Sequence, residues 1–115
     1  MKNRHRIRER YLKDPVPIRL AGLAADLGRV ASSARYSSGS ASVDQMLEES
    51  QYFIEWTAAE TKPEIAVELV DIQLMLSLWR KAWPEAQHST TQRTLLSFQA
   101  KKWSDKVLDF SGLRD

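Results

Sequence analysis

Carboxylates are the side chains of this chain best suited to acid–base chemistry. They line the edges of two expected helices: Glu64, Glu68 and Asp71 on one, and Glu48 and Glu55 on the other. Paired carboxylates transfer protons when burial or charge shifts their pKa values inside a cleft. The pattern places no His, Lys or Tyr opposite these residues with any specificity. Solvated edges that meet Arg or Lys are therefore favoured over a catalytic site.

Metal-binding and nucleophilic motifs would be the next route to chemistry. Glu85 and His88 match half of the Glu-x-x-His ligand motif of di-iron bundles, but the motif occurs once, after Pro84, where a linker is expected. The chain has no cysteine, which excludes thiolate nucleophiles and cysteine-based metal sites. It also lacks a phosphate-binding loop and a nucleophile elbow. We therefore expect no bound metal, no cofactor and no enzymatic activity.

Four arginines lie close together near the N-terminus: Arg4, Arg6, Arg8 and Arg10. The planar guanidinium group suits phosphate binding. Residues 1–13 are therefore expected to form a basic arm outside a single helical domain of residues 14–115, and the arm is a candidate for binding nucleic acid. No aromatic residues interleave with the arginines, as they do in many such modules. A solvated terminus, or an arm docked on the acidic second helix, is favoured over nucleic-acid binding.

Tyr52 and Trp56 form an aromatic pair one helical turn apart. They point away from the inward face that carries Leu47 and Ile54. Large, rigid aromatic side chains are typical anchors of protein interfaces, which makes this pair a candidate site for an unidentified protein partner. The alternative is internal packing, either over a neighbouring helix end or under the basic arm through arginine–aromatic stacking.

The segment from residue 64 to residue 84 is apolar on two opposite sides of one helix. One stripe consists of Ile65, Leu69, Ile72, Leu76, Trp79 and Trp83. The second stripe consists of Val67, Val70, Leu74 and Leu78. A surface helix needs only one buried stripe, so the second requires a cover of its own, from a further helix of the chain or from a second copy. We expect the second stripe to be the interface of a homodimer.

Apolar periodicity and end signals predict four helices and no strand. Asp14 before Pro15 is expected to cap the first helix, and residues 37–41 form a flexible connector. Capping boxes are expected to begin the other three helices: Ser42 with Gln45, Thr61 with Glu64, and Ser89 with Gln92. Pro84 is expected to end the third helix and Gly112 the fourth. Short connectors then favour an all-α, antiparallel four-helix bundle with a basic N-terminal arm.

The bulk composition is typical of one globular domain, with 115 residues, 43% hydrophobic and 28% charged. The net charge of +2 is unevenly distributed: residues 1–35 hold nine basic and three acidic groups, and residues 36–70 hold one and seven. Such opposition favours neighbouring elements of unlike charge. Glu68 and Asp71 interrupt the most apolar run, and no secretory signal is recognisable, so a cytoplasmic protein is expected.

Several segments resemble a small, uncharacterised all-helical family typical of cyanobacteria. They are residues 14–29, 47–50, 52–57, 103–108 and 111–113. The resemblance covers about residues 14–113, implies a cytoplasmic helical protein and carries no catalytic residues. We therefore expect a non-enzymatic helical bundle that acts through protein–protein contact, as a homodimer. The alternative is a nucleic-acid-associated accessory protein that uses the arginine arm.

Overall fold

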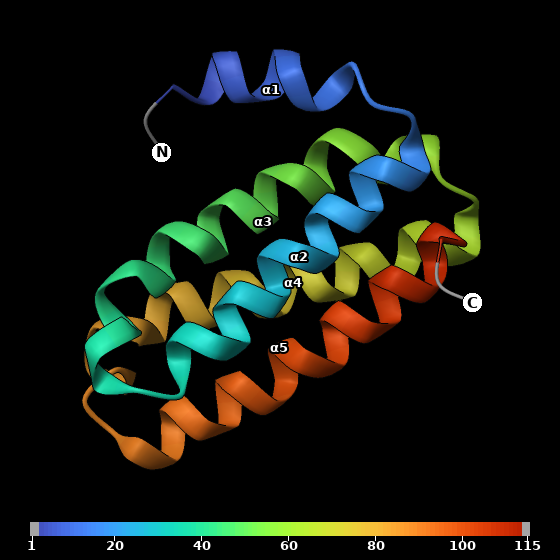
Figure 1. Cartoon of the computed structure of the whole chain (residues 1–115). Helices are drawn as coiled ribbons and strands as arrows, with labels where there is room; N and C mark the ends of the chain where they lie inside the picture. Colours follow the sequence, from blue (N-terminus) through green and yellow to red (C-terminus); the bar gives the residue numbers. More distant parts are fainter. Residues whose placement is uncertain (1–2, 114–115) are drawn as a thin grey trace.

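The computed structural model describes residues 3–113, which contain helices and no strand. The α-helices are α1 (Arg4–Leu12), α2 (Val16–Ala34), α3 (Val43–Thr57), α4 (Pro63–Ala86) and α5 (Thr90–Ser111), and two short 3₁₀ helices are η1 (Ser37–Ser42) and η2 (Ala58–Glu60). The all-α class is confirmed. Within the described residues the helix count is five instead of four, because residues 4–12 form α1 where an arm was expected (Figure 1). None of the helices in this range is both long and apolar enough to cross a membrane.

The helix α2 lies at the centre of the packing. It contacts α5 along most of its length and α3 on another side, while α4 packs mainly on α3 and α1 lies across α3 (Figure 1). Leucines from every long helix fill the core without exposure to solvent: Leu23, Leu27, Leu47, Leu69, Leu76 and Leu96. The first stripe predicted for α4 thus lines a hydrophobic core that it shares with residues of α2, α3 and α5.

Small side chains let α2 and α5 approach closely. The Ser97 hydroxyl donates a hydrogen bond to the carbonyl oxygen of Ala31 at 2.7 Å, and the Ser104 hydroxyl donates to that of Ala24 at 2.7 Å. Gly28 faces Ser104, and a Cβ at this position would lie 3.5 Å from the hydroxyl oxygen. The two serine bonds give partners to hydroxyls that the close contact would otherwise leave without hydrogen bonds.

Only one of the four predicted N-terminal caps is confirmed. The Ser89 hydroxyl accepts a hydrogen bond from the Gln92 amide at 3.2 Å, whereas α2, α3 and α4 begin without a side-chain cap. Asp14 lies one residue too early, because Pro15 occupies the cap position. Ser42 and Thr61 instead donate to the carbonyl oxygens of the residues three positions before them. Ser42 ends the 3₁₀ helix η1 and Thr61 directly follows η2, and the 3₁₀ turn brings such a carbonyl within reach of the hydroxyl.

Two predicted helix ends have opposite outcomes. Pro84 does not end α4, which continues to Ala86. A proline removes one backbone donor and crowds the preceding turn. Here it falls in the last turn, where the buried Trp83 and Ala86 on either side hold the chain in helical form. Gly112 ends α5 as predicted, with a left-handed φ of 72° that favours glycine.

The segment expected to be a flexible connector is ordered as η1. Gly39 lies so close to α2 that a Cβ at this position would come within 2.6 Å of the Ser33 carbonyl oxygen. The indole nitrogen of Trp83 donates a hydrogen bond to the Ser40 carbonyl oxygen at 2.9 Å. The connector is therefore held between the end of α2 and the end of α4, and glycine is required at residue 39 for lack of space.

Candidate functional site

The outer face of α4 carries a row of exposed aliphatic side chains. Their exposed fractions are 62% for Val67, 51% for Val70, 61% for Leu74 and 54% for Leu78. No part of the chain within residues 3–113 covers them, which removes a further helix of this range as the cover considered in the sequence analysis. The prediction that a second copy covers this outer face stays a prediction.

The apolar surface continues from α4 onto α5. A pocket of about 300 Å³ lies between the two helices, lined by Met75, Leu78, Trp79, Ala82, Gln92, Leu95 and Gln99. Leu95, which α5 contributes to this pocket, is 43% exposed. Trp79 is the buried aromatic residue of this lining, and its indole nitrogen donates a hydrogen bond to the side-chain oxygen of Gln99 at 2.8 Å. The outer face of α4 and Leu95 therefore form one apolar surface, larger than the sequence pattern had indicated.

The charged residues beside this face differ in whether they have partners. Lys106 pairs with Glu68 at 2.5 Å, and Arg80 pairs with Glu48 at 3.0 Å, so these two carboxylates belong to helix–helix contacts as expected. Glu64, Asp71 and Lys81 are exposed and have no ion-pair partner within residues 3–113. Along α4, the acidic Glu64 and Asp71 come first, the basic Lys81 follows, and the exposed Glu85 lies in the last turn. Glu55 is an exposed residue of α3.

The aromatic pair Tyr52 and Trp56 is half-buried. The two rings lie 5.5 Å apart, and Trp56 also contacts Tyr11 and Phe53 with ring centroids 6.0 Å away in each case. Arg4 donates a hydrogen bond to the Tyr52 hydroxyl at 2.5 Å, with its guanidinium 5.0 Å from the ring centroid. This geometry matches the alternative of packing under an arginine, and partner binding by the pair stays a prediction.

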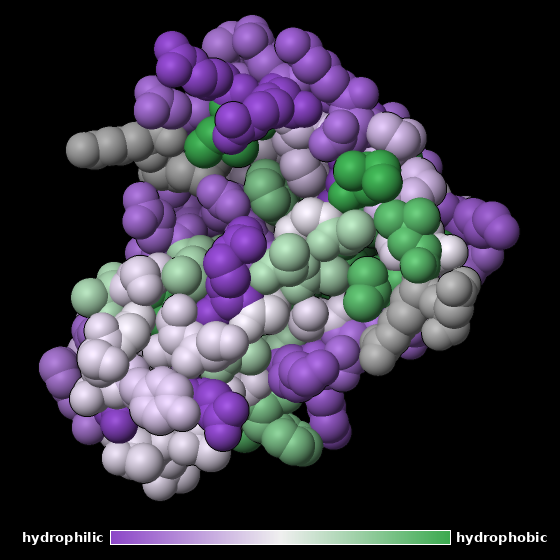
Figure 2. All heavy atoms as spheres, in the orientation of Figure 1, coloured by the Kyte–Doolittle hydropathy of each residue, from purple (hydrophilic) through white to green (hydrophobic). Residues whose placement is uncertain are grey.

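The segment expected to be a basic arm is the helix α1, which packs on the rest of the protein. Tyr11 is buried, stacks on Phe53 at a centroid distance of 4.0 Å, and donates from its hydroxyl to the Arg19 carbonyl oxygen at 2.6 Å. Burial raises the pKa of Tyr11 to about 12. The helix separates the four arginines into two pairs, Arg4 with Arg8 and Arg6 with Arg10, because residues four apart share a side. Figure 2 shows hydrophilic side chains covering the outer surface of α1.

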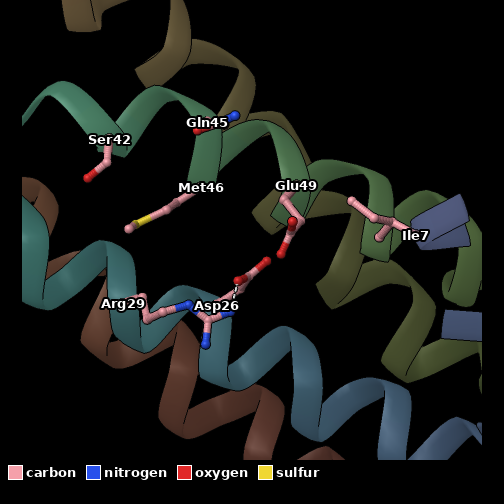
Figure 3. A pocket seen from close by; sticks show the side chains of 7 residues that line it. All are labelled: Ile7, Asp26, Arg29, Ser42, Gln45, Met46 and Glu49. Atoms are coloured by element: carbon pink, nitrogen blue, oxygen red, sulfur yellow. Dashed lines mark hydrogen bonds and ion pairs between the residues drawn. The ribbon is translucent and has the colours of Figure 1, made fainter. Parts of the chain in front are cut away.

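A second site, which the sequence analysis did not detect, lies between α2 and α3. Asp26 is 1% exposed, and its carboxylate points toward that of Glu49 (Figure 3). Arg29 pairs with one Asp26 oxygen, Oδ1, whereas Oδ2 has no hydrogen-bond donor. Asp26 and Arg29 of α2 line a pocket of about 240 Å³ together with residues of α1, η1 and α3: Ile7, Ser42, Gln45, Met46 and Glu49.

Burial is the main cause of the pKa shift of Asp26. Burial first, and then the close approach and charge of the Glu49 carboxylate, raise the pKa of Asp26 to about 8, and Arg29 opposes these effects. One feature of the sequence could have revealed this site. Asp26 lies three residues after Leu23 and four before Val30, next to the inward stripe of α2, with Arg29 one turn later. Its carboxylate partner is 23 residues away in the sequence, which no local pattern reveals.

Within residues 3–113, no three His, Cys, Asp or Glu side chains lie together in a group that could hold a metal ion. Glu85 and His88 are exposed. No protein-family model, no curated protein and no solved structure matches this chain. The resemblance to a cyanobacterial family therefore stays a prediction, and proposals about function depend on the geometry of the two sites.

Proposed function

We propose that this protein is a non-enzymatic interaction module of the cytoplasm that pairs with a second copy of itself through the outer face of α4. Its framework would be an antiparallel bundle of α2 to α5, with α1 as an added helix. The observation that carries the proposal is the row of four exposed aliphatic side chains, Val67, Val70, Leu74 and Leu78. Contiguous apolar surface of this kind is rare on monomers and typical of association sites.

Burial supplies the driving force for this association. Complete burial of a Val or Leu side chain stabilises by about 1.5–3 kcal/mol. The four side chains are between half and two thirds exposed, so each contributes about 1 kcal/mol per copy when covered. Two copies contribute eight such side chains, and part of that gain offsets the entropy lost on association. Leu95 and the adjoining pocket extend the same surface.

The order of charges along α4 favours a second copy over an unrelated partner. In a two-fold symmetric pair with antiparallel α4 helices, Leu74 near the middle of the row meets its own counterpart. Lys81, seven residues after Leu74, then lies opposite Val67, seven residues before it. Glu64 and Asp71 flank Val67 and have no ion-pair partner among residues 3–113 of their own chain. Pairs of this type contribute about 0–1 kcal/mol each and mainly set the register.

Replacement of Leu74 by glutamate is expected to convert the dimer into a folded monomer. The change would place two unpaired carboxylates at the centre of the interface, which should raise the dimer Kd by about 100-fold or more. Because Leu74 is 61% exposed in the single chain, the helical circular dichroism spectrum should not change. Light scattering coupled to gel filtration measures the mass of each species.

A matched control is Ile18→Glu, which adds the same charge at a 43% exposed apolar residue of α2, away from α4. This variant should remain dimeric. A wild-type protein that is monomeric at all concentrations tested would contradict the proposal. So would an L74E variant that keeps the dimer mass.

Nucleic-acid binding through α1 is a second candidate, favoured by one observation. Arg6, Arg8 and Arg10 are exposed and have no ion-pair partner within residues 3–113. The double variant Arg6→Ala/Arg10→Ala should weaken binding to a fluorescent DNA duplex and reduce the slope of log K against log salt by about 2. Substitution is preferable to removal of residues 1–13, because removal would also delete the buried Tyr11.

The control for this measurement is Lys101→Ala/Lys102→Ala, which removes two exposed cations of α5. If α1 binds the phosphates, the control should keep the wild-type salt slope. Absence of binding at low salt, or equal binding by both double variants, would rule out this candidate.

A further inference from the structure

The Asp26 carboxylate is buried between helices with an incomplete set of hydrogen bonds. Its side chain is 2% exposed, and the Arg29 guanidinium pairs with Oδ1 alone. Oδ2 has no donor, although it is shielded from solvent. In Figure 3 the carboxylate of Glu49 points toward it from α3. Two groups that only accept hydrogen bonds when ionised therefore point at each other.

Two ionised carboxylates in this position would be costly. A buried charged oxygen without a hydrogen bond loses its hydration without replacement. Two like charges in contact also repel each other, so a carboxylate pair of this kind retains one proton between its members. A proton on Asp26 Oδ2 converts that oxygen into a donor toward Glu49. One proton thus supplies the missing hydrogen bond and removes the repulsion.

We propose that Asp26 and Glu49 together bind one proton from solvent, which joins α2 to α3 as a carboxyl–carboxylate hydrogen bond and is released as the pH rises. The remaining negative charge is balanced by Arg29, so the protonated site is neutral overall. This proton-binding site is independent of the proposed α4 interface, which lies on a different helix.

The groups that face the pair from each neighbouring element are consistent with a proton as the bound species. From α2 the charged neighbour is Arg29, and from α3 it is Glu49 itself. Arg10 and Tyr11 of α1, with Asp14, line an adjoining pocket that also includes Glu49. The described residues of α5 contribute nothing to the lining of either pocket. The guanidinium on Oδ1 would repel a divalent cation, whereas it tolerates a neutral carboxyl group.

The direction of the pH dependence follows from the pKa of Asp26, which burial and Glu49 raise to about 8. The folded protein then holds this proton more tightly than the unfolded chain, in which an Asp titrates near its ordinary pKa of about 3.9. The site therefore stabilises the fold fully below about pH 4, and this contribution is lost as the pH rises toward 8.

The test compares thermal unfolding of the wild type and Asp26→Asn at about pH 5.5 and about pH 8.5. The wild-type midpoint should fall by about 10 °C between these conditions. The Asn side chain has the shape of a protonated Asp, donates to Glu49 and accepts from Arg29. The D26N midpoint should therefore stay level and exceed that of the wild type at the higher pH.

Carbon-13 NMR of the side-chain carboxyl groups gives a direct readout. One carboxyl resonance of the wild type should titrate with a midpoint near 8 and be absent from D26N. Glu49→Gln, which supplies an amide donor to Asp26 Oδ2, should also reduce the pH dependence of unfolding. Glu55→Gln, at an exposed position on the same helix, should leave it unchanged.

Two results would overturn the proposal. One is a wild-type unfolding midpoint that does not change with pH, together with carboxyl resonances that all titrate below about pH 6. The other is recovery of stability at high pH on addition of Mg²⁺ or Ca²⁺ alone, which would show that the pair holds a metal ion in place of a proton.

Discussion

Replacement of Leu76 by alanine should lower the free energy of unfolding by about 2–5 kcal/mol, because Leu76 has no exposure to solvent. The change removes buried methyl groups and leaves a cavity where α4 meets the other helices. Leu74, two residues earlier, is 61% exposed on the opposite face. In a monomer, Leu74→Ala should therefore cost less than about 1 kcal/mol.

Urea denaturation of both variants at several protein concentrations separates the two faces of α4. The loss in Leu76→Ala should be the same at every concentration, since it arises inside one chain. The loss in Leu74→Ala should grow with concentration if that face is covered by a second copy, because association stabilises the folded state by mass action. Equal losses in the two variants at low concentration would contradict the assignment of Leu76 to the core and Leu74 to the surface.

Replacement of Tyr11 by alanine should detach α1 from the other helices and lower the free energy of unfolding by about 3–5 kcal/mol, as expected for a buried aromatic residue. Tyr11 is the only described residue of α1 that is fully in the core, and the stacked ring of Phe53 would lose its partner. The hydroxyl also bonds the Arg19 carbonyl oxygen, and the Arg19 side chain pairs with Glu60 at 2.7 Å. The tyrosine therefore joins α1 to the α2–η2 corner.

Limited digestion with trypsin measures this detachment, since α1 contains four arginines. Tyr11→Ala should be cut within residues 4–10 much faster than the wild type, while α2 to α5 stay resistant. Tyr11→Phe keeps the ring and loses only the hydroxyl bond, so it should cost about 0.5–1.5 kcal/mol and remain resistant. Unchanged digestion of the alanine variant would show that α1 does not depend on Tyr11.

Local sequence predicted some features of the fold correctly, whereas three of the four predicted caps and the predicted helix end at Pro84 were wrong. The long apolar stripes of α2 and α4 are buried as their periodicity indicated, because a helix with an apolar stripe is stable only when that stripe leaves water. Ser89 and Gly112 act at their helix ends as predicted, because each depends on residues within one turn. The exposed row on α4 was also recognisable from the sequence, although its uncovered state in the single chain was not.

Tertiary contacts decided the remaining features. The apolar residues Ile7, Tyr11 and Leu12 are too few in the charged sequence of α1 for a local helix signal. The contact of Tyr11 with the aromatic ring of Phe53 supplies the rest. Pro84 stays helical because its buried neighbours outweigh the lost hydrogen bond.

The pairing of Asp26 with Glu49 depends on how α2 and α3 face each other. Sequence by itself determined which helix faces are apolar, since that depends on residue type and helical period. Only the tertiary structure decided which polar groups those faces enclose, because burial of a charge depends on residues far apart in the chain.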